Sequence, residues 1–231
     1  MCVTCGCSDT ASRPDTEVLL LEERVLAKND HLAAHTRASL AAEGIVALNV
    51  MSSPGAGKTS LLERTIRERE DTTFAVIEGD QETSFDADRI RAAGARAVQV
   101  NTGAGCHLDA DMVHRAVHEL APKPGSVLFV ENVGNLVCPA LFDLGERAKV
   151  VVISVTEGDD KPLKYPHMFA AADLVVVNKT DLMPYVDFDV DQLAKHARSL
   201  NPGIDVLPLS VRSGERIDEW YGWLDRTCRT T

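Results

Sequence analysis

The chain of 231 residues, 45% hydrophobic and 5% aromatic, is long enough to bury one large α/β core, or one core with a short appendage. Its net charge of −11 argues against a surface for nucleic acid or anionic lipid, and no apolar run approaches the roughly 18 residues that a membrane span needs. Without a basic-then-apolar leader we expect a cytoplasmic protein, in which six cysteines indicate metal binding rather than a disulfide scaffold.

The first segment, residues 1–15, carries a CxxCxC pattern at Cys2, Cys5 and Cys7. Three thiolates this close together can wrap one soft or borderline cation such as Ni²⁺ or Zn²⁺. A thioredoxin-like thiol pair is disfavoured, because that motif would open a helix after a strand, whereas a thiol-bearing tail without a ligand stays open. Residues 8–15 are polar, which predicts a short tether between the cysteines and the body of the protein. The apolar spacing over residues 16–43 predicts one or two helices packed outside a sheet.

A phosphate-binding loop follows the first predicted strand, 45–51, and leads into a helix predicted at 57–69. Gly55 and Gly57 let backbone N–H groups turn toward phosphate oxygens. Lys58 can then reach the β and γ phosphates, and Thr59 offers its hydroxyl to Mg²⁺. Ser52 holds the place of the pattern's first glycine. The nucleotide-binding residues predicted here are Ser53, Pro54, Gly55, Ala56, Gly57, Lys58, Thr59 and Ser60.

Acidic residues end two further predicted strands, 73–79 and 126–131. The first closes in Glu78-Gly79-Asp80 and the second in Glu131-Asn132-Val133-Gly134. Either carboxylate end could hold Mg²⁺ together with the phosphate loop, and we favour Asp80 first and Glu131 second. A role in a turn or a cap stays open for both. Gly134 could donate its N–H to the γ phosphate as a switch.

A second group of soft ligands lies at the same predicted sheet edge. Cys106 and His107 follow the strand predicted at 96–101, and Cys138 comes shortly after the strand that ends at residue 131. Two thiolates and an imidazole leave one tetrahedral position open, or shared with a second subunit. Structural cysteines and a capping histidine are an equal alternative on spacing alone. The other histidines have no metal-ligating neighbours along the chain, and we expect them on the surface or on helix faces: His31, His35, His114, His118, His167 and His196.

The nucleotide base is indicated by Asn178-Lys179-Thr180-Asp181, which follows the strand predicted at 173–178. The carboxylate of Asp181 can accept from guanine N1–H and from the exocyclic amine, which adenine cannot supply. Asn178 can hold the base edge, and the stem of Lys179 can lie over the ring. Ser210 and Val211, after the strand predicted at 204–209, resemble a further loop whose backbone contacts guanine O6. A polar strand-to-helix turn is the alternative.

Strands and helices alternate from residue 45 onward, and a further strand is expected at 149–155. The remaining helices are predicted at 84–94, 109–120, 162–171, 189–200 and 214–226. Continuous Val, Ile and Leu runs indicate strands that are covered on both faces. The pattern predicts an α/β fold with one doubly wound, mostly parallel sheet and helices on both faces, as in a P-loop NTPase. We expect one GTPase domain over residues 44–231.

With these parts in order, nearly the whole chain resembles the hydrogenase nickel-incorporation GTPases, the HypB family, within the SIMIBI class of P-loop proteins. The resemblance rests on Met-Cys-Val-Thr-Cys-Gly-Cys, Ser-Ser-Pro-Gly-Ala-Gly-Lys-Thr, Gly-Ala-Gly-Cys-His-Leu-Asp, Glu-Asn-Val-Gly-Asn-Leu-Val-Cys-Pro, Glu-Gly-Asp-Asp-Lys-Pro-Leu-Lys-Tyr-Pro and Asn-Lys-Thr-Asp. One departure is that residues 8–30 contain no histidine, whereas many relatives have a histidine-rich stretch there, so bulk nickel storage is doubtful.

The resemblance implies a tight Ni²⁺ site at Cys2, Cys5 and Cys7, and a Ni²⁺ or Zn²⁺ site at the second cluster. It also implies a homodimer formed on GTP binding, in which Lys161 helps to hold the partner's nucleotide. The implied partners are the hydrogenase large-subunit precursor, which receives nickel, and other hydrogenase maturation factors. Because no side chain is an evident general base for water, we expect GTP hydrolysis to GDP to be slow.

Four other functions compete with this one. A urease-type nickel GTPase or a chaperone for a cobalamin enzyme would share the fold, but the N-terminal CxxCxC argues against both. A small-molecule kinase would not need the guanine motif. A partitioning or electron-transfer ATPase usually carries a lysine where Ser53 stands. A metal-buffering protein would use its nucleotide site only to stabilise the fold.

Overall fold

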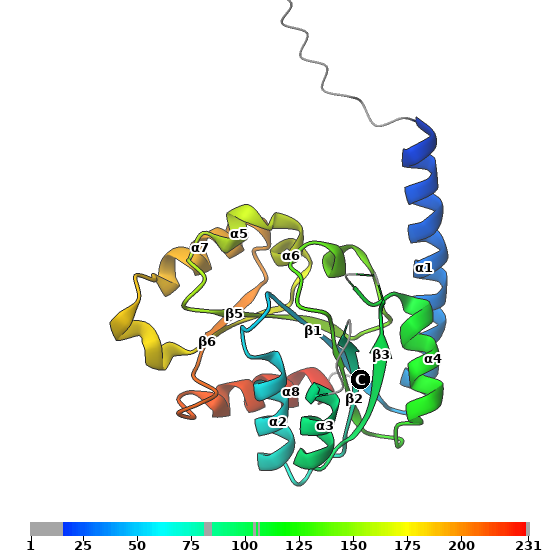
Figure 1. The fold of residues 1–231 in the computed structure, drawn as a ribbon, viewed down its shortest axis with the longest axis horizontal. Coiled ribbons are helices and arrows are strands. Elements are labelled where there is room, and N and C mark those ends of the chain that lie inside the picture. The colour runs from blue at the N-terminus through cyan, green and yellow to red at the C-terminus, as the bar shows by residue number, and fades with distance from the viewer. Residues whose placement is uncertain (1–15, 81–84, 104, 106, 230–231) are drawn as a thin grey trace, which may run out of the picture.

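The core is one parallel sheet of seven strands. The computed structural model describes residues 16–80, 85–103, 105 and 107–229. The strands stand in the order β3-β2-β4-β1-β5-β6-β7 (Figure 1), and each of the six pairings is parallel. The strands are β1 (Val46–Ser52), β2 (Phe74–Asp80), β3 (Arg96–Asn101), β4 (Val127–Glu131), β5 (Ala148–Ser154), β6 (Leu174–Asn178) and β7 (Asp205–Pro208). The predicted fold class is confirmed, and all seven predicted strands are present.

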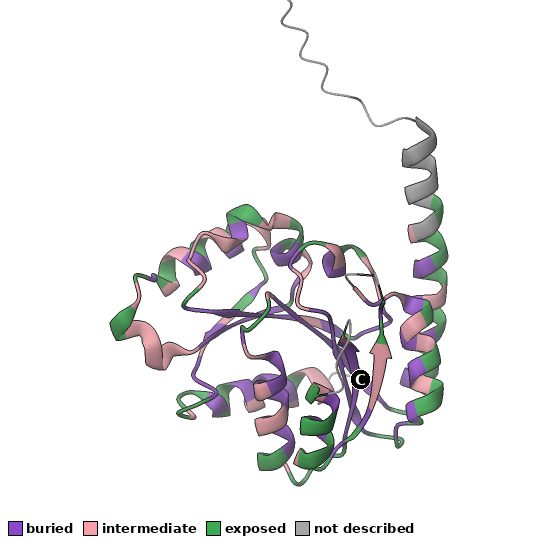
Figure 2. Ribbon diagram, in the orientation of Figure 1, coloured by how far each residue is buried: buried purple, intermediate pink, exposed green. Residues whose placement is uncertain are grey.

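Helices cover both faces of the sheet, which is why its central strands are almost wholly apolar and buried (Figure 2). One face packs on α2 (Lys58–Glu68), α3 (Phe85–Ala93) and α8 (Ile217–Arg229). The other packs on α4 (Ala110–Leu120), α6 (Pro166–Ala171), α7 (Val190–Leu200) and the end of α1 (Thr16–Ala42). Successive residues of β1 alternate between the two cores, because side chains along a strand point to opposite faces.

The helix predicted at 162–171 is two helices in the structure, α5 (Lys161–Lys164) and α6. Pro166 starts α6, and the residue before a proline is disfavoured in the helical region. Tyr165 accordingly has φ −128° and ψ 56°, which breaks the chain into two short helices. Two further turns are 3₁₀ helices, η1 (Cys138–Leu141) and η2 (Thr180–Tyr185).

The N-terminal helical segment is a single helix in the described part of the chain, α1, which runs alongside α4 (Figure 1). Asn29 connects the two elements. Its Oδ1 accepts from the N–H of Ala110 at 2.9 Å, and its Nδ2 donates to the carbonyl of Asp143 at 2.8 Å. Because Asn29 is buried, these bonds hold α1 against the start of α4. None of the helices in the described ranges combines the length and apolar character that a bilayer crossing requires.

The strand order reverses at β1, which lies between β4 and β5. In an open parallel sheet, ligands bind outside the carboxyl ends of the strands at this reversal point. The loop after β1 is the predicted phosphate loop, and the loop after β4 carries Gly134 and Cys138. The topology therefore places a ligand-binding edge at the loops after β1 and β4.

Candidate functional site

The phosphate loop joins β1 to α2 with two glycines in the left-handed region, Gly55 at φ +75° and Gly57 at φ +105°. Lys58 and Thr59 open α2 and are both buried. The Lys58 ammonium donates to Ser52 Oγ at 2.8 Å, so the serine in place of the usual first glycine holds the phosphate-binding lysine. A cavity of about 450 Å³ lies against the loop and is large enough for the phosphates of a nucleotide.

Three carboxylates face this cavity and lie together. One oxygen from each of Glu78, Asp86 and Glu131 falls within a group whose atoms are all within 4.8 Å of one another. Thr59 Oγ1 donates to Glu131 Oε1 at 2.6 Å. Glu78 and Glu131 are 3% and 2% exposed, and Oε2 of each has no hydrogen-bond partner among the described residues.

Burial is the main cause that raises the pKa of Glu78, and the negative charge of Glu131 raises it further. Burial likewise raises the pKa of Glu131, although Lys58 opposes the shift. Two buried carboxylates with unpaired oxygens beside a threonine hydroxyl are the donor set that a hard divalent cation prefers. This part of the structure therefore fits Mg²⁺.

Glu78 and Asp86 are residues that sequence reasoning did not select for the metal. Asp80, which we favoured, lines the same cavity, but the carboxylates grouped with Glu131 are those of Glu78 and Asp86. The sequence did indicate Glu78 indirectly, because Glu78-Gly79-Asp80 forms the acidic end of β2. Asp86 begins α3 beyond that strand, and its position beside the loop could not be read from spacing.

Arg89 is a further residue that the sequence did not indicate. Its guanidinium donates to Asp86 at 2.9 Å and to Glu63 at 2.7 Å, and it reaches Ser60 Oγ at 3.2 Å. Arg89 also lines the phosphate cavity. It places a permanent cation beside the phosphate loop, where a nucleotide would bring negative charge.

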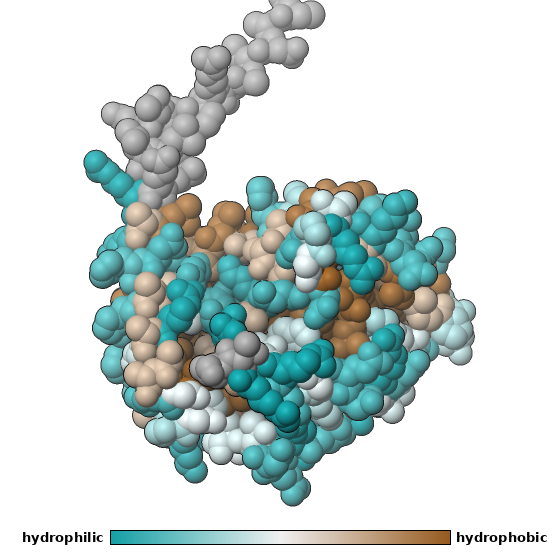
Figure 3. Space-filling view, turned by 180° about the vertical axis from the view of Figure 1, so that it is seen from behind, coloured by the Kyte–Doolittle hydropathy of each residue, from teal (hydrophilic) through white to brown (hydrophobic). Residues whose placement is uncertain are grey.

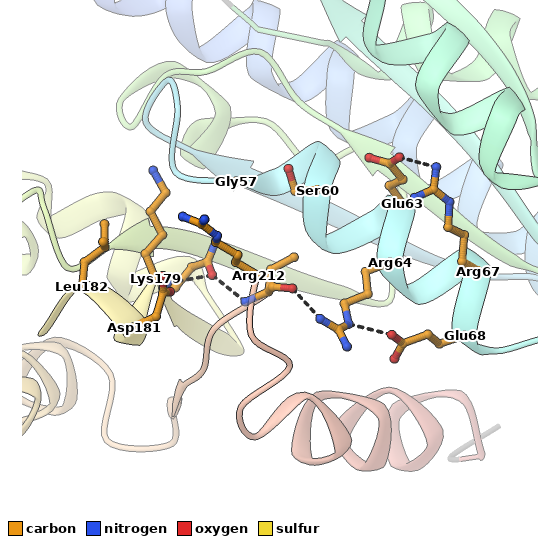
Figure 4. Close-up of a pocket in the computed structure, with 12 residues that line it drawn as sticks. Gly57, Ser60, Glu63, Arg64, Arg67, Glu68, Lys179, Asp181, Leu182 and Arg212 are labelled. Atoms are coloured by element: carbon orange, nitrogen blue, oxygen red, sulfur yellow. Dashed lines mark hydrogen bonds and ion pairs between the residues drawn. The ribbon is translucent and has the colours of Figure 1, made fainter.

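A second cavity, of about 630 Å³, adjoins the first, since Gly57 and Ser60 line both. Figure 4 shows Lys179 and Asp181 on one side of it and Arg64 of α2 on the other. Ser210 Oγ donates to Asp181 Oδ1 at 2.6 Å, which orients the carboxylate. The Asp181 carboxylate is thus fixed at the cavity that adjoins the phosphate-loop cavity.

The Asn178 side chain connects its own turn to the phosphate loop and to the loop after β7. Its Nδ2 donates to the carbonyl of Ala56 at 2.9 Å, and its Oδ1 accepts from the N–H of Val211 at 3.1 Å. Its side chain is buried, so it positions the phosphate loop and the Ser210 loop. Gly57 is required here, because a Cβ at that position would lie 2.4 Å from Asn178 Nδ2.

Lys179 has φ +66° and ψ 37°, a left-handed conformation that L residues seldom adopt. Its ammonium donates to the carbonyl of Gly55 at 2.8 Å, so the side chain crosses the mouth of the cavity toward the phosphate loop. The contact of the Lys179 stem with a guanine ring stays a prediction.

Glu157 connects the phosphate loop to the segment that contains Lys161. It accepts from the hydroxyl of Ser53 and from the N–H of Ser154, and its carboxylate lies 3.4 Å from the Lys161 ammonium. Lys161 is therefore held close to its own phosphate loop.

Gly134 also approaches the phosphate loop, since a Cβ at this position would lie 3.2 Å from Pro54.

The second soft-ligand group is only partly described. His107 is half-buried and stacks on Phe142, with ring centroids 4.1 Å apart. Burial lowers the pKa of His107 and so favours the neutral imidazole, the form that binds metals. Cys138 begins η1 and is partly exposed. Cys106, like Cys2, Cys5 and Cys7, lies outside the described residues, so these metal sites stay predictions.

The remaining histidines were expected on the surface or on helix faces, and three of them, on α1 and α4, also contact one another. His35, His114 and His118 lie together where α1 packs on α4. The spacing of His114 and His118 on one predicted helix was visible in the sequence, whereas His35 belongs to a different helix and the packing of α1 on α4 was not predicted.

Comparison with known proteins gives a consistent result. A family model described as the CobW/HypB/UreG nucleotide-binding domain matches residues 46–208. The hydrogenase maturation factor HypB of Rhizobium leguminosarum bv. viciae is 58% identical over 209 residues, which cover 90% of this chain and 70% of that protein.

Two solved structures share the fold over most of both chains. HypB from Helicobacter pylori in complex with nickel superposes with a TM-score of 0.84 at 40% identity, covering 87% of this chain and 95% of the other. The hydrogenase maturation factor HypB from Archaeoglobus fulgidus superposes with a TM-score of 0.82 at 38% identity, covering 88% of this chain and 100% of the other.

Proposed function

Because the chain belongs to the HypB group of the CobW/HypB/UreG family, we propose that it is a GTPase that binds nickel and delivers it to [NiFe]-hydrogenase precursors. The observation that carries the proposal is the pair of cavities that meet at the phosphate loop, one lined by Lys58 and buried carboxylates and the other by Asp181. A guanine nucleotide would span both.

In this proposal the phosphate loop, Lys58 and Arg89 bind the phosphates, and Asp181 selects guanine. Thr59, Glu131 and Glu78 would hold Mg²⁺, and Asp80 remains a candidate at the same cavity. Bound there, the ion would neutralise charge on the β and γ phosphates. Glu131 already orients the Thr59 hydroxyl, and Asn178 holds the phosphate and guanine loops in register.

Nickel is the cargo of this reaction, and Zn²⁺ is an alternative occupant of the second cluster. Cys2, Cys5 and Cys7 would form one site, and Cys106, His107 and Cys138 the other. The second lies on the loops after β3 and β4, and the β4 loop also carries Gly134. If GTP and GDP place these loops differently, metal affinity must differ between the two states, typically by about 1 to 3 kcal/mol.

We propose further that GTP binding drives homodimerisation in the cytoplasm. Apolar side chains interrupt the hydrophilic surface (Figure 3). Val137 and Leu141, both 53% exposed, lie close to Cys138 in the sequence. A second copy that covers these residues would close over the loop that carries Cys138. The Lys161 of that second copy would then lie near the nucleotide of the first. The dimer would then act with other hydrogenase maturation factors on the large-subunit precursor.

The proposal is tested by GTP turnover, nickel titration and particle mass on one set of proteins. We expect slow GTP hydrolysis that Lys58→Ala abolishes, and nickel affinity that differs between GDP and a non-hydrolysed GTP analogue. Cys138→Ser should weaken nickel binding in one nucleotide state more than in the other. Equal nickel affinity in both states would contradict the coupling, and rapid hydrolysis by a dilute monomer would contradict the role of the dimer.

Dimerisation has a separate test. Leu141→Asp places a charge on the exposed apolar surface, so the GTP-bound protein should remain monomeric when its mass is measured by light scattering. The control is Tyr185→Asp, because Tyr185 is 83% exposed on η2 and away from Cys138 in the sequence. If both variants dimerise as the parent does, the surface around Cys138 is not the interface.

A further inference from the structure

Three imidazoles meet on the surface where α1 and α4 run side by side (Figure 1). The ring centroids of His35 and His114 are 5.5 Å apart, and those of His114 and His118 are 4.6 Å apart, both in edge-to-face arrangement. His35 and His118 are exposed and His114 is half-buried, so a small ion can reach the group from solvent.

The spacing within the group matches that of metal ligands. His114 Nε2 and His118 Nε2 are 3.2 Å apart and share a hydrogen bond, which an ion bound to both nitrogens would replace. Two imidazole nitrogens that each lie about 2.0 to 2.1 Å from one cation are about 3.3 to 3.4 Å apart in tetrahedral geometry and about 2.8 to 3.0 Å apart in octahedral geometry. The two residues are four positions apart on one helix, which places both rings on the same face. His35 is exposed beside them and can reach a shared ion through a change of rotamer.

A buried hydroxyl orients the central imidazole. Thr36 is 1% exposed, and its Oγ1 lies 3.2 Å from His114 Nδ1. If Nδ1 carries the proton and donates to Thr36, Nε2 keeps a lone pair on the side where His118 lies. A ligating histidine usually has its second nitrogen held in this way. The two helices are also fixed to each other by Asn29, so the backbone segments that carry the three histidines are positioned before any ion binds, and the His35 side chain completes the group by its change of rotamer.

The His114 imidazole is also in the protonation state that metal binding requires. Burial lowers the pKa of His114, and the neighbouring His118 and His35 lower it further, whereas Asp111 opposes the shift. The imidazole is therefore neutral at pH 7 and can donate its lone pair to a cation. The three residues lie outside both nucleotide cavities and make no contact that the nucleotide site needs.

We propose that His35, His114 and His118 form a separate site for a borderline divalent cation, of the class of Ni²⁺ or Zn²⁺. These ions bind imidazole nitrogen well, whereas Mg²⁺ and Ca²⁺ prefer oxygen ligands. The site lies on the helix that follows the tether from the N-terminal cysteines and on the helix that begins three residues after His107. An ion bound there ties α1 to α4.

The test uses the full chain with Cys2, Cys5, Cys7, Cys106 and Cys138 all replaced by serine, so that the predicted thiolate ligands are absent. We expect this background to bind about one equivalent of Ni²⁺ or Zn²⁺ by equilibrium dialysis. His118→Ala or His114→Ala should weaken that binding by about tenfold or more. His167→Ala is the matched control, because His167 is also an exposed helical histidine but lies on α6.

Zn²⁺ titration followed by histidine-ring NMR should shift the signals of His114 and His118 and leave that of His167 in place. The proposal is overturned if the background binds neither ion, or if His167→Ala weakens binding as much as His118→Ala does. GTP turnover of the otherwise wild-type His118→Ala protein should be unchanged, which separates failure of this site from failure of the proposed nucleotide function.

The positioning role of Thr36 has its own test. Thr36→Val keeps the volume and removes the hydroxyl, so Zn²⁺ affinity should fall on the order of tenfold and the nitrogen-15 shifts of His114 should report a changed tautomer balance. Thr36→Ser keeps the hydroxyl and should restore both. A Thr36→Val protein with parental affinity and an unchanged tautomer would show that the hydroxyl does not act on the imidazole.

Discussion

Glu78 and Glu131 come from neighbouring strands, β2 and β4, which pair these two residues in register. Both are buried and each leaves one carboxylate oxygen without a partner among the described residues. Two such charges in the interior destabilise the fold unless they are protonated or share a cation. The two carboxylates therefore lower the stability of the protein without an ion and raise its affinity for a divalent ion.

The first prediction concerns pH in the absence of divalent ions. Because burial raises the pKa of Glu78 above its ordinary 4.5, the folded state holds a proton that the unfolded state releases. The free energy of unfolding should therefore fall as pH rises above that value. Glu78→Gln removes one ionisable group of the pair and should flatten the fall, measured by urea unfolding at pH 5.5 and pH 8 in chelator.

The control for that measurement is Glu119→Gln, at an exposed position of α4, which should retain the parental pH dependence. Parallel loss of stability in the parent and in Glu78→Gln would show that the buried pair does not titrate as described. Added Mg²⁺ should restore stability more at pH 8 than at pH 5.5, because the ion competes with protons for the same oxygens.

The second prediction concerns the base. Asp181→Asn presents an amide N–H₂ to the donors of guanine, so at least one charge-assisted hydrogen bond, worth about 1.5 to 3 kcal/mol, is lost. GDP should bind at least tenfold more weakly in calorimetric titration, and a xanthine nucleotide, whose C2 carries a carbonyl, should bind better than GDP. Asp187→Asn, exposed beyond η2, is the control. An unchanged GDP affinity in Asp181→Asn would remove this carboxylate from the base site.

At the scale of elements, α1 is attached to the body by side-chain bonds as well as by apolar packing. Asn29 bonds the start of α4 and the carbonyl of Asp143, and Arg37 forms an ion pair with the Asp143 carboxylate at 2.5 Å. The ion pair is largely exposed and contributes little, whereas the amide is buried. The position of α1 therefore depends mainly on Asn29 and on the apolar contact of Leu40 with the core.

The third prediction follows from this attachment. Asn29→Ala leaves the N–H of Ala110 and the carbonyl of Asp143 without their partner, and the free energy of unfolding should fall by about 1 to 3 kcal/mol. Urea unfolding with an unchanged slope would measure it. Lys28→Ala, at the exposed neighbouring position, should change stability by less than about 0.5 kcal/mol. Equal effects of the two substitutions would mean that the buried amide does not hold α1.

At the scale of the whole molecule, one nucleotide would join parts of the fold that are far apart in the sequence. The phosphate loop, the Asp181 turn and the Ser210 loop already share bonds through Asn178 and through Arg64, whose guanidinium donates to the carbonyl of Val211 at 2.7 Å. A ligand that binds only the folded chain stabilises all of it by mass action.

The fourth prediction is the size of that linkage. GDP at 100 times its dissociation constant should raise the free energy of unfolding by about 2.7 kcal/mol, measured by urea unfolding with and without the nucleotide. ADP at the same concentration should give no comparable shift, because adenine lacks the donors that Asp181 accepts. A shift of the same size with ADP would show that the phosphates alone determine binding.

Much of the architecture could be predicted from the sequence, because its signals are local. Runs of Val, Ile and Leu between helical periods identified all seven strands, and glycines at 55 and 57 with Lys58 and Thr59 identified the loop after β1. Asn178 and Asp181 were recognised as one motif. The role of Asn178 was not, since its partners Ala56 and Val211 come from other loops.

What the sequence determined by itself is the order of elements, the parallel sheet and the chemistry of its phosphate loop, since each depends on neighbours along the chain. The tertiary structure alone decided which acids meet and which histidines meet. Register between β2 and β4 set Glu78 beside Glu131, and the packing of α1 on α4 set His35 beside His114 and His118. Those contacts join residues far apart along the chain, and no local pattern encodes them.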